Sequence, residues 1–167
     1  MVIETLDTEL KGAITERHAF RGDETAVVGL DRLLDVAALL KKEGFLLLVD
    51  ITAVDWPQRP ESHGQGRFDL VYHWLNPNTQ ERVRIKAVVA EDQWAPSLVG
   101  LFKTADWYER EVFDMFGIPF TGHPDLRRLL TWEDFPGHAL RKDFPLDGGD
   151  AYCMADSTAP YNNGTRS

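Results

Sequence analysis

Two stretches of alternating residues, 67–75 and 81–90, constrain the fold more than any other feature of the chain. Large hydrophobic residues take every second position of the first stretch: Phe68, Leu70, Tyr72 and Trp74. In the second stretch, Val83 and Ile85 alternate with arginine and lysine. A period of two is typical of a strand with one buried face, and the Asn-Pro-Asn-Thr sequence at 76–79 favours a turn. The pattern predicts an antiparallel hairpin in a sheet with one covered face.

Residues that precede the hairpin supply further elements of a layered domain. The stretches 25–30 and 45–54 are apolar enough to be strands. Residues 33–42 repeat hydrophobic positions at the spacing of a helix. We expect Asp31 to cap the start of this helix and Gly44 to end it. The residues before the first strand are expected to form a helix-rich start.

A second strong helix follows Asp106, which is expected at its N-cap. Glu109, three residues later, would complete a capping box. Gly117 can adopt the left-handed conformation that ends a helix, and Pro119 prevents the helix from continuing. A short helix over 96–104 is predicted just before it.

One face of this second helix is crowded with charge. It carries Glu109, Arg110, Glu111 and Asp114. Charge pairs at helical spacing stabilise a helix by only about 0.2–0.5 kcal/mol, so helix stability explains these residues poorly. Two interpretations remain: the face is solvated, or it meets cations of a partner protein.

The segment that follows, residues 121–145, is expected to be an extended strap. Its prolines favour extended backbone at the residues before them, and it holds more large apolar side chains than a loop left in water would. Aromatic residues and arginine are typical anchors of protein interfaces. We therefore expect a partner interface on the strap and the charged helix face. The predicted interface residues are Glu109, Arg110, Glu111, Asp114, His123, Arg127, Arg128, Trp132, Arg141, Lys142 and Phe144.

These elements together predict an α+β fold. The expected arrangement has two layers, a mixed β-sheet with helices on one face, followed by the long extended C-terminal strap. We expect the α+β domain to occupy residues 1–120, the partner-binding strap residues 121–145, and a flexible tail residues 146–167.

Charge and hydrophobicity narrow the class of protein. The chain has 167 residues, 43% of them hydrophobic, which suits a single soluble domain. Its net charge of −9 argues against nucleic-acid binding, because phosphate contacts require clustered lysine and arginine. No apolar stretch is long enough to span a bilayer, and the first residues lack the pattern of a secretion signal. We expect membrane association only through partners.

Cysteine content bears on cofactors. Cys153 is the only cysteine, which suits a reducing compartment and cannot supply the several thiolates of an iron–sulfur cluster. The sequence also lacks the glycine-rich fingerprints of nucleotide binding. The chain is therefore expected to bind no metal or cofactor and to have no catalytic residues of its own.

Four blocks carry a resemblance to a known family. They read Glu-Arg-Glu at 109–111, Asp-Met-Phe-Gly-Ile at 114–118, Gly-His-Pro-Asp-Leu-Arg-Arg-Leu-Leu at 122–130, and Gly-His-x-Leu-Arg-Lys-Asp-Phe-Pro at 137–145. In this order they resemble the 30-kilodalton-subunit family, the C component, of respiratory complex I, the proton-translocating NADH:quinone oxidoreductase. The upstream layout fits the family's domain from about residue 25.

The resemblance implies a non-catalytic structural subunit in the hydrophilic arm of complex I, peripheral on the cytoplasmic side of the bacterial inner membrane. It implies docking on the large quinone-site subunit, the D component, beside subunits that carry clusters. The whole complex would use FMN, iron–sulfur clusters and a quinone to transfer electrons from NADH to quinone, with proton translocation coupled to the transfer. Arg127, Arg128 and Arg141 would bond partner carboxylates or carbonyls, while the acidic residues would meet partner cations or orient the strap.

Two alternatives stay open. Related subunits serve membrane-bound hydrogenases and F420-linked dehydrogenases, so the electron donor and the quinone type are not decided by the motifs. From the residues alone, a small metal-dependent hydrolase is also conceivable, in which Glu109, Glu111, Asp114 and His123 form a metal or acid–base site.

Overall fold

The framework of the molecule is a five-stranded sheet with strand order β1-β2-β5-β4-β3. The computed structural model describes residues 2–59 and 66–146. The strands are β1 (Ile14–Phe20), β2 (Asp23–Val28), β3 (Leu47–Asp55), β4 (Phe68–Leu75) and β5 (Arg82–Val89). Strands β2 and β5 run parallel, and the other neighbours run antiparallel. The predicted hairpin, β4 and β5, forms the middle of this mixed sheet.

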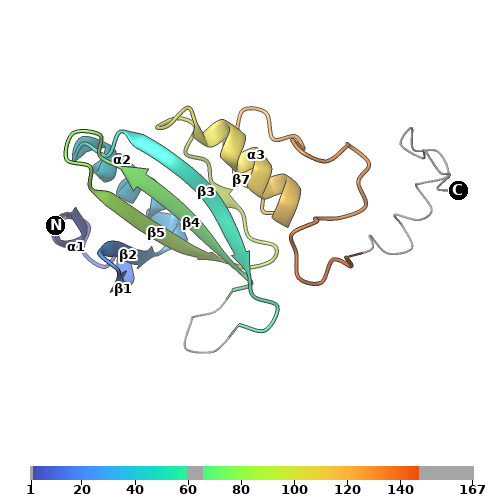
Figure 1. The fold of residues 1–167 in the computed structure, drawn as a ribbon, viewed down its shortest axis with the longest axis horizontal. Coiled ribbons are helices and arrows are strands. Elements are labelled where there is room, and N and C mark those ends of the chain that lie inside the picture. The colour runs from blue at the N-terminus through green and yellow to red at the C-terminus, as the bar shows by residue number, and fades with distance from the viewer. Residues whose placement is uncertain (1, 60–65, 147–167) are drawn as a thin grey trace, which may run out of the picture.

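Helices cover one face of the sheet. They are α1 (Val2–Glu9), α2 (Leu33–Lys42), which follows the 3-10 turn η1 (Leu30–Arg32), and α3 (Ala105–Phe116). A short parallel ribbon, β6 (Ala95–Pro96) with β7 (Phe120–Thr121), brackets α3. Figure 1 shows α2 behind the strands and α3 alongside β3. The predicted α+β class is confirmed.

The hydrophobic core lies between the sheet and the helices. The alternating positions predicted to be buried are each at most 2% exposed: Phe68, Leu70, Tyr72, Trp74, Val83 and Ile85. Apolar residues of the helices close the core from the other side, chiefly Leu33, Val36, Ala37, Leu40, Val112, Met115 and Phe116. The alternation in β4 and β5 thus fixes which face of the sheet receives the helices.

The expected helix-rich start is met in part by α1, but two features near the N-terminus differ from the expectation. Strand β1 was not predicted, because most of its residues are polar and exposed, as an edge strand permits. Asp31 does not cap α2; it lies within η1, and the N-cap of α2 is Arg32, with no side-chain cap hydrogen bond.

The approach to α3 also differs from the expectation. Residues 96–104 are not a helix, because Ser97 donates its amide to the carbonyl of Thr121 at 2.9 Å in the β6–β7 ribbon. The N-cap of α3 is Thr104 rather than Asp106. Glu109 completes no capping box; it points into the core and accepts a hydrogen bond from the Leu98 amide at 2.6 Å.

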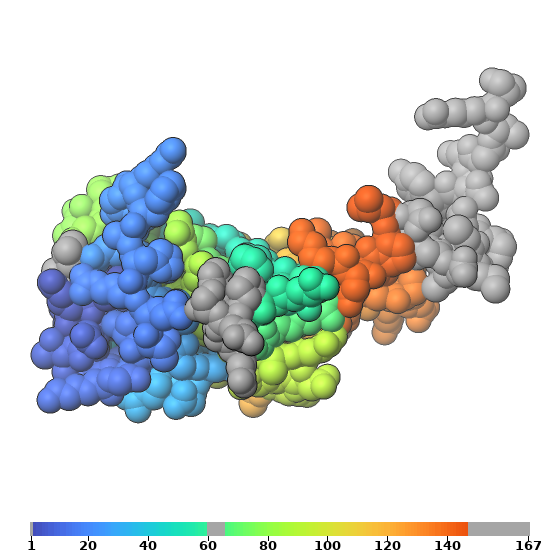
Figure 2. Space-filling view, turned by 90° about the horizontal axis from the view of Figure 1, so that it is seen from below, coloured from blue at the N-terminus to red at the C-terminus, as the bar shows by residue number. Residues whose placement is uncertain are grey.

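The C-terminal end of α3 follows the prediction. Gly117 has a φ of 75° and donates its amide to the carbonyl of Phe113 at 2.9 Å. After β7 the described chain, up to Leu146, contains no helix or strand. Figure 2 shows this orange segment extending from one end of the domain. Beyond Leu146 the predicted tail lies outside the described residues.

Candidate protein–protein interface

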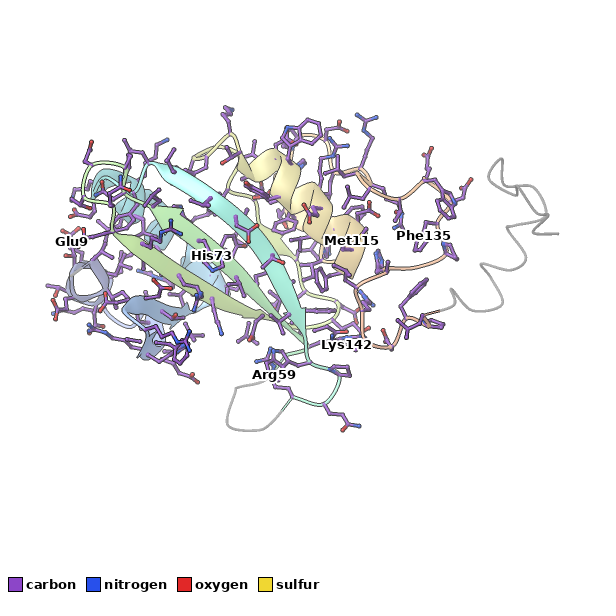
Figure 3. All side chains as sticks on the ribbon, in the orientation of Figure 1. Glu9, Arg59, His73, Met115, Phe135 and Lys142 are labelled. Atoms are coloured by element: carbon purple, nitrogen blue, oxygen red, sulfur yellow. The ribbon has the colours of Figure 1, made fainter. Side chains whose placement is uncertain are left out.

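The strap, residues 121–145, returns against the C-terminal half of α3. Arg110 of α3 donates Nε to the carbonyl of Arg127 at 3.1 Å and Nη2 to the carbonyl of Arg128 at 3.3 Å. Figure 3 shows Phe135 far out on the strap and Lys142 where the strap passes the end of the sheet. The strap is therefore held against α3 at residues 127 and 128.

Asp114 is the central anchor of the strap. Its Oδ2 accepts the amides of Leu129, Leu130 and Thr131 at 2.9, 2.7 and 2.9 Å. Its Oδ1 accepts Arg128 Nη1 at 2.9 Å and the hydroxyl of Thr131. Burial alone would raise the pKa of Asp114, but the hydrogen bonds from Thr131, Leu130 and Arg128 outweigh it and hold the pKa well below the usual range. The carboxylate stays charged and keeps residues 128–131 on the helix.

Arg128 joins two parts of the strap to this carboxylate. Besides Asp114, it donates Nη1 to the carbonyl of Gly137 at 3.0 Å and Nη2 to the carbonyl of Phe135 at 3.2 Å. Its guanidinium also lies 5.9 Å from the centre of the Phe135 ring. The guanidinium of Arg128 is thus hydrogen-bonded within the chain. Its several N–H donors allow it to connect Asp114 with two carbonyl groups of the strap.

The strap also caps the C-terminal end of α3. Successive carbonyls of the last turn accept hydrogen bonds: Asp114 from His138 Nδ1 at 2.9 Å, Met115 from the Leu140 amide at 3.1 Å, and Phe116 from Arg141 Nε at 2.6 Å. The last carbonyls of a helix have no partner within the helix. A cationic group there also interacts favourably with the helix dipole. The end of α3 and the strap therefore stabilise each other.

Gly117 leaves room for this capping. A Cβ atom at this position would lie 2.5 Å from His138 Nε2 and 2.7 Å from Arg141 Nη2. Its positive φ would also be strained for any other residue. Glycine is therefore required both by the helix end and by the strap packed on it.

The far end of the strap is tied to the sheet through Arg67. The guanidinium of Arg67 lies 2.9 Å from Asp55, 2.6 Å from Glu91 and 2.8 Å from Asp143 of the strap. The amide of Lys142 donates to Asp55 Oδ2 at 2.8 Å. Sequence reasoning missed this cluster, because its members are far apart along the chain and none carries a motif on its own.

The near end of the strap is fixed by His123. Its Nδ1 accepts the amide of Asp125 at 3.0 Å, so its Nε2 carries the proton and donates toward the carbonyl of Asp106 at 3.2 Å. Asp125 in turn pairs with Arg127 at 2.6 Å, with the Arg127 side chain 73% exposed. Arg127, unlike Arg128, is therefore available at the surface.

Besides exposed charged residues such as Arg127, Glu133 and Asp134, the outward face of the strap carries large apolar side chains. Leu130, Trp132 and Leu140 are 64%, 50% and 52% exposed. Behind them, Phe135 packs edge-on against Trp132 and stacks near Phe144, with ring centres 4.9 and 5.5 Å apart. The predicted interface residues thus separate into internal anchors and outward groups. Whether a partner contacts them stays a prediction.

The alternative metal or acid–base site is not assembled in the described structure. Glu109 faces the core, Asp114 faces the strap, and His123 faces the start of α3, while Glu111 is exposed. Within residues 2–59 and 66–146, no group of three or more candidate ligand side chains is placed to hold a metal ion.

Comparison with known proteins identifies the family to which the chain belongs. Residues 26–150 match the family model of the respiratory-chain NADH dehydrogenase 30-kilodalton subunit, a range that includes strands β3, β4 and β5, helix α3 and the strap. The chain belongs to this family. Similar members are the C components of NADH-quinone oxidoreductase from Rhizobium rhizogenes and Rhodobacter capsulatus. The first is 45% identical over 87% of this chain and 72% of that protein, and the second 48% over 82% and 68%.

Two solved structures of similar proteins extend the family likeness to the fold. A trypsin-resistant fragment of Nqo5 has a TM-score of 0.66 and 32% identity, and covers 75% of this chain and all of the fragment. A chain of the membrane-bound sulfane sulfur reductase, an archaeal respiratory membrane complex, has a TM-score of 0.73 and 25% identity. It covers 99% of this chain and 94% of its own length. Among the described residues, no helix of this family member is long and apolar enough to cross a membrane.

Proposed function

We propose that this chain is a structural, non-catalytic subunit of NADH:quinone oxidoreductase that docks through its strap on the large quinone-site subunit. The observation that carries the proposal is the exposure of three large apolar side chains, Leu130, Trp132 and Leu140, on a strap that the Asp114–Arg128 ion pair helps to hold in place. A surface of this kind is recognised by burial of apolar side chains, which form the centre of stable interfaces.

A fixed strap suits a scaffolding role. Electron transfer and quinone chemistry require that neighbouring subunits keep a set geometry, and rigid contacts provide it. Because Asp114, Arg128 and Arg141 fix the strap in the free chain, docking has less chain to order and is correspondingly stronger. Relatives named as the same component of this oxidoreductase support the choice of complex.

The remaining parts of the proposal concern chemistry and location. NADH oxidation, FMN, the iron–sulfur clusters and the quinone would reside in other subunits, and this chain would bind none of them. Membrane association would be through the complex, on the cytoplasmic side of the bacterial inner membrane. The second candidate is the equivalent subunit of a membrane-bound hydrogenase or an F420-linked dehydrogenase. The likeness to a chain of an archaeal respiratory membrane complex, the membrane-bound sulfane sulfur reductase, supports keeping this candidate.

The test is binding of the whole chain to the co-expressed large quinone-site subunit. Leu130→Ser with Leu140→Ser should weaken binding by roughly 30-fold or more, because two leucines each lose about 1–2 kcal/mol of burial. The matched control is Leu47→Ser with Val49→Ser, which changes residues of similar exposure, 47% and 44%, on β3. The control should bind normally.

The outcomes separate the candidates. Equal loss in both double variants, or in neither, would remove the strap from the interface. Nickel-ligating cysteines in the large subunit that co-purifies from the native host would favour a hydrogenase-type complex instead.

A further inference from the structure

Glu109 is a buried carboxyl group that the strap does not use. It lies on α3 with no exposed surface, and its Oε1 accepts the Leu98 amide at 2.6 Å. Its Oε2 has no hydrogen-bond partner among the described residues. Asp114, little more than one turn later on the same helix, is equally buried but is surrounded by donors. The two carboxyl groups therefore lie in opposite environments.

In the part of the chain that the structure describes, the groups that face Glu109 offer it no cation. From β4 comes Tyr72, which stacks on Trp74 with ring centres 5.6 Å apart. The Tyr72 hydroxyl and Trp74 Nε1 are buried and, like Glu109 Oε2, have no partner within the described residues. On α3 itself the nearest charge is Asp106, which repels a second negative charge. This part of the core thus holds several polar atoms, and within residues 2–59 and 66–146 no positive group pairs with Glu109.

Charges on the surrounding elements are directed elsewhere. His123, which follows β7, lies 3.4 Å from Asp106 Oδ1. Lys41 of α2 donates to the carbonyl of Leu101 at 2.6 Å and lies over the ring of Phe102. Arg110, next to Glu109 on α3, extends toward the strap.

An ionised carboxylate buried without a cation is costly, whereas the neutral acid is a hydrogen-bond donor that tolerates burial. Burial raises the pKa of Glu109 to about 7, against the opposing hydrogen bonds from Leu98 and Ser97, and repulsion by Asp106 adds to the rise. Burial, repulsion by Asp106 and the chemistry of a carboxyl group therefore all favour the neutral acid at Glu109.

We propose that Glu109 is a proton-binding site that controls how firmly α3, and with it the strap, is held on the domain. The neutral acid keeps α3 bonded to the 97–98 segment. Loss of the proton places an uncompensated charge beside Tyr72 and loosens α3, the helix on which Asp114, Met115 and Phe116 anchor the strap. This inference concerns the free chain and does not depend on which complex the chain joins.

The sign of the effect follows from linkage. Because the pKa in the fold exceeds the ordinary value of 4.5, the fold binds the proton more tightly than the unfolded chain does. The stabilisation is complete below the ordinary value and is lost as the pH rises through about 7. From this group alone, the unfolding equilibrium constant should rise about 30-fold between about pH 5.5 and about pH 8.5.

The experiment compares the full chain with Glu109→Gln, which mimics the neutral acid. Urea unfolding is measured at both pH values for both chains. Between the two pH values, the unfolding equilibrium constant of the wild type should rise about 30-fold more than that of Glu109→Gln. The other ionisable groups are present in both chains, so their contribution cancels in the comparison. The matched control is Asp106→Asn, a partly exposed carboxylate on the same helix, which should keep most of the dependence of the wild type on pH.

Two further readouts keep the proposal testable. Infrared spectra of the wild type should contain the carbonyl band of a protonated carboxylic acid that disappears as the pH rises through about 7. At the higher pH, the amides of Leu98, Leu129 and Leu140 should exchange with deuterium faster in the wild type than in Glu109→Gln. Absence of the band at about pH 5.5, or an equal pH dependence in wild type and Glu109→Gln, would overturn the proposal. If Glu109→Gln fails to fold, the infrared titration of the wild type decides alone.

Discussion

Asp114 and Arg128 form an ion pair within one chain, with Arg128 Nη1 2.9 Å from Asp114 Oδ1 and side-chain exposures of 0% and 19%. The sequence predicts both residues as contacts to a partner. Since each neutralises the other, a partner would not need to supply the counter-charge for either. The pair instead sets the shape of the strap before any docking takes place.

Neighbouring arginines provide the sharpest test of this arrangement. Arg128→Ala leaves the buried Asp114 carboxylate without its cation and should destabilise the strap by about 3–5 kcal/mol. Arg127→Ala should have no measurable effect on the free chain, because the Arg127 side chain is 73% exposed and its pair with Asp125 lies at the surface. Limited proteolysis within residues 128–141 measures the difference. Equal protection of both variants would show that Arg128 does not hold the strap.

Acid should release the strap through Asp114. The pKa of Asp114 is lowered in the fold, so its stabilising contribution is present above the ordinary value near 4 and is lost as the pH falls toward the lower folded value. Pepsin, which is active in acid, should cut the strap increasingly below about pH 4. In Asp114→Asn the strap should be cut to the same extent at every acidic pH. A wild-type pattern in this variant would assign the acid effect to another group.

Gly117 should tolerate no side chain. Gly117→Ala forces a φ of 75° on a residue with a Cβ, which costs about 1–2 kcal/mol, and places that Cβ against His138 and Arg141. We expect a lower thermal midpoint together with a strap that proteases cut more readily. Gly100→Ala is the control, because a Cβ there meets nothing within 4 Å and its φ is not positive. Equal midpoints in the two variants would contradict the packing described here.

Absorbance of the purified chain checks the assignment of cofactors to other subunits. The full chain, which has a single cysteine, should show no visible absorbance from flavin, haem or an iron–sulfur cluster. Iron and acid-labile sulfide in stoichiometric amounts would require a cluster ligand set that one thiolate cannot provide.

Local patterns were sufficient for the parts of the fold that depend on neighbouring residues. The hairpin of β4 and β5, helix α2 and the left-handed Gly117 all follow from periodicity or from one residue's conformational freedom. Periodicity could not predict strand β1, because β1 has no buried face and forms through its hydrogen bonds to β2. The expectation that Glu109 caps the helix is wrong for a related reason. A glutamate near the start of a helix has the same sequence position whether it caps the helix or points into the core.

The sequence also predicts only part of the candidate site on the strap. Its position and its lack of helix or strand follow from prolines and composition. The roles of its charges do not, because they depend on partners such as Asp55 and Glu91 that lie far away in the chain. A charged residue in a loop looks the same whether its counter-ion belongs to its own chain or to another protein.

Four residues that hold the strap come before it in the chain: Asp55 and Arg67 at the end of the sheet, and Arg110 and Asp114 on α3. During synthesis, the surface that receives the strap is therefore complete before the strap leaves the ribosome. A chain that failed to pair β3 with β4 would not bring Asp55 to Arg67 and could not hold the strap in shape. Exposure of Leu130, Trp132 and Leu140 in this arrangement thus depends on a correctly folded domain, so under the proposed function a misfolded copy would not dock.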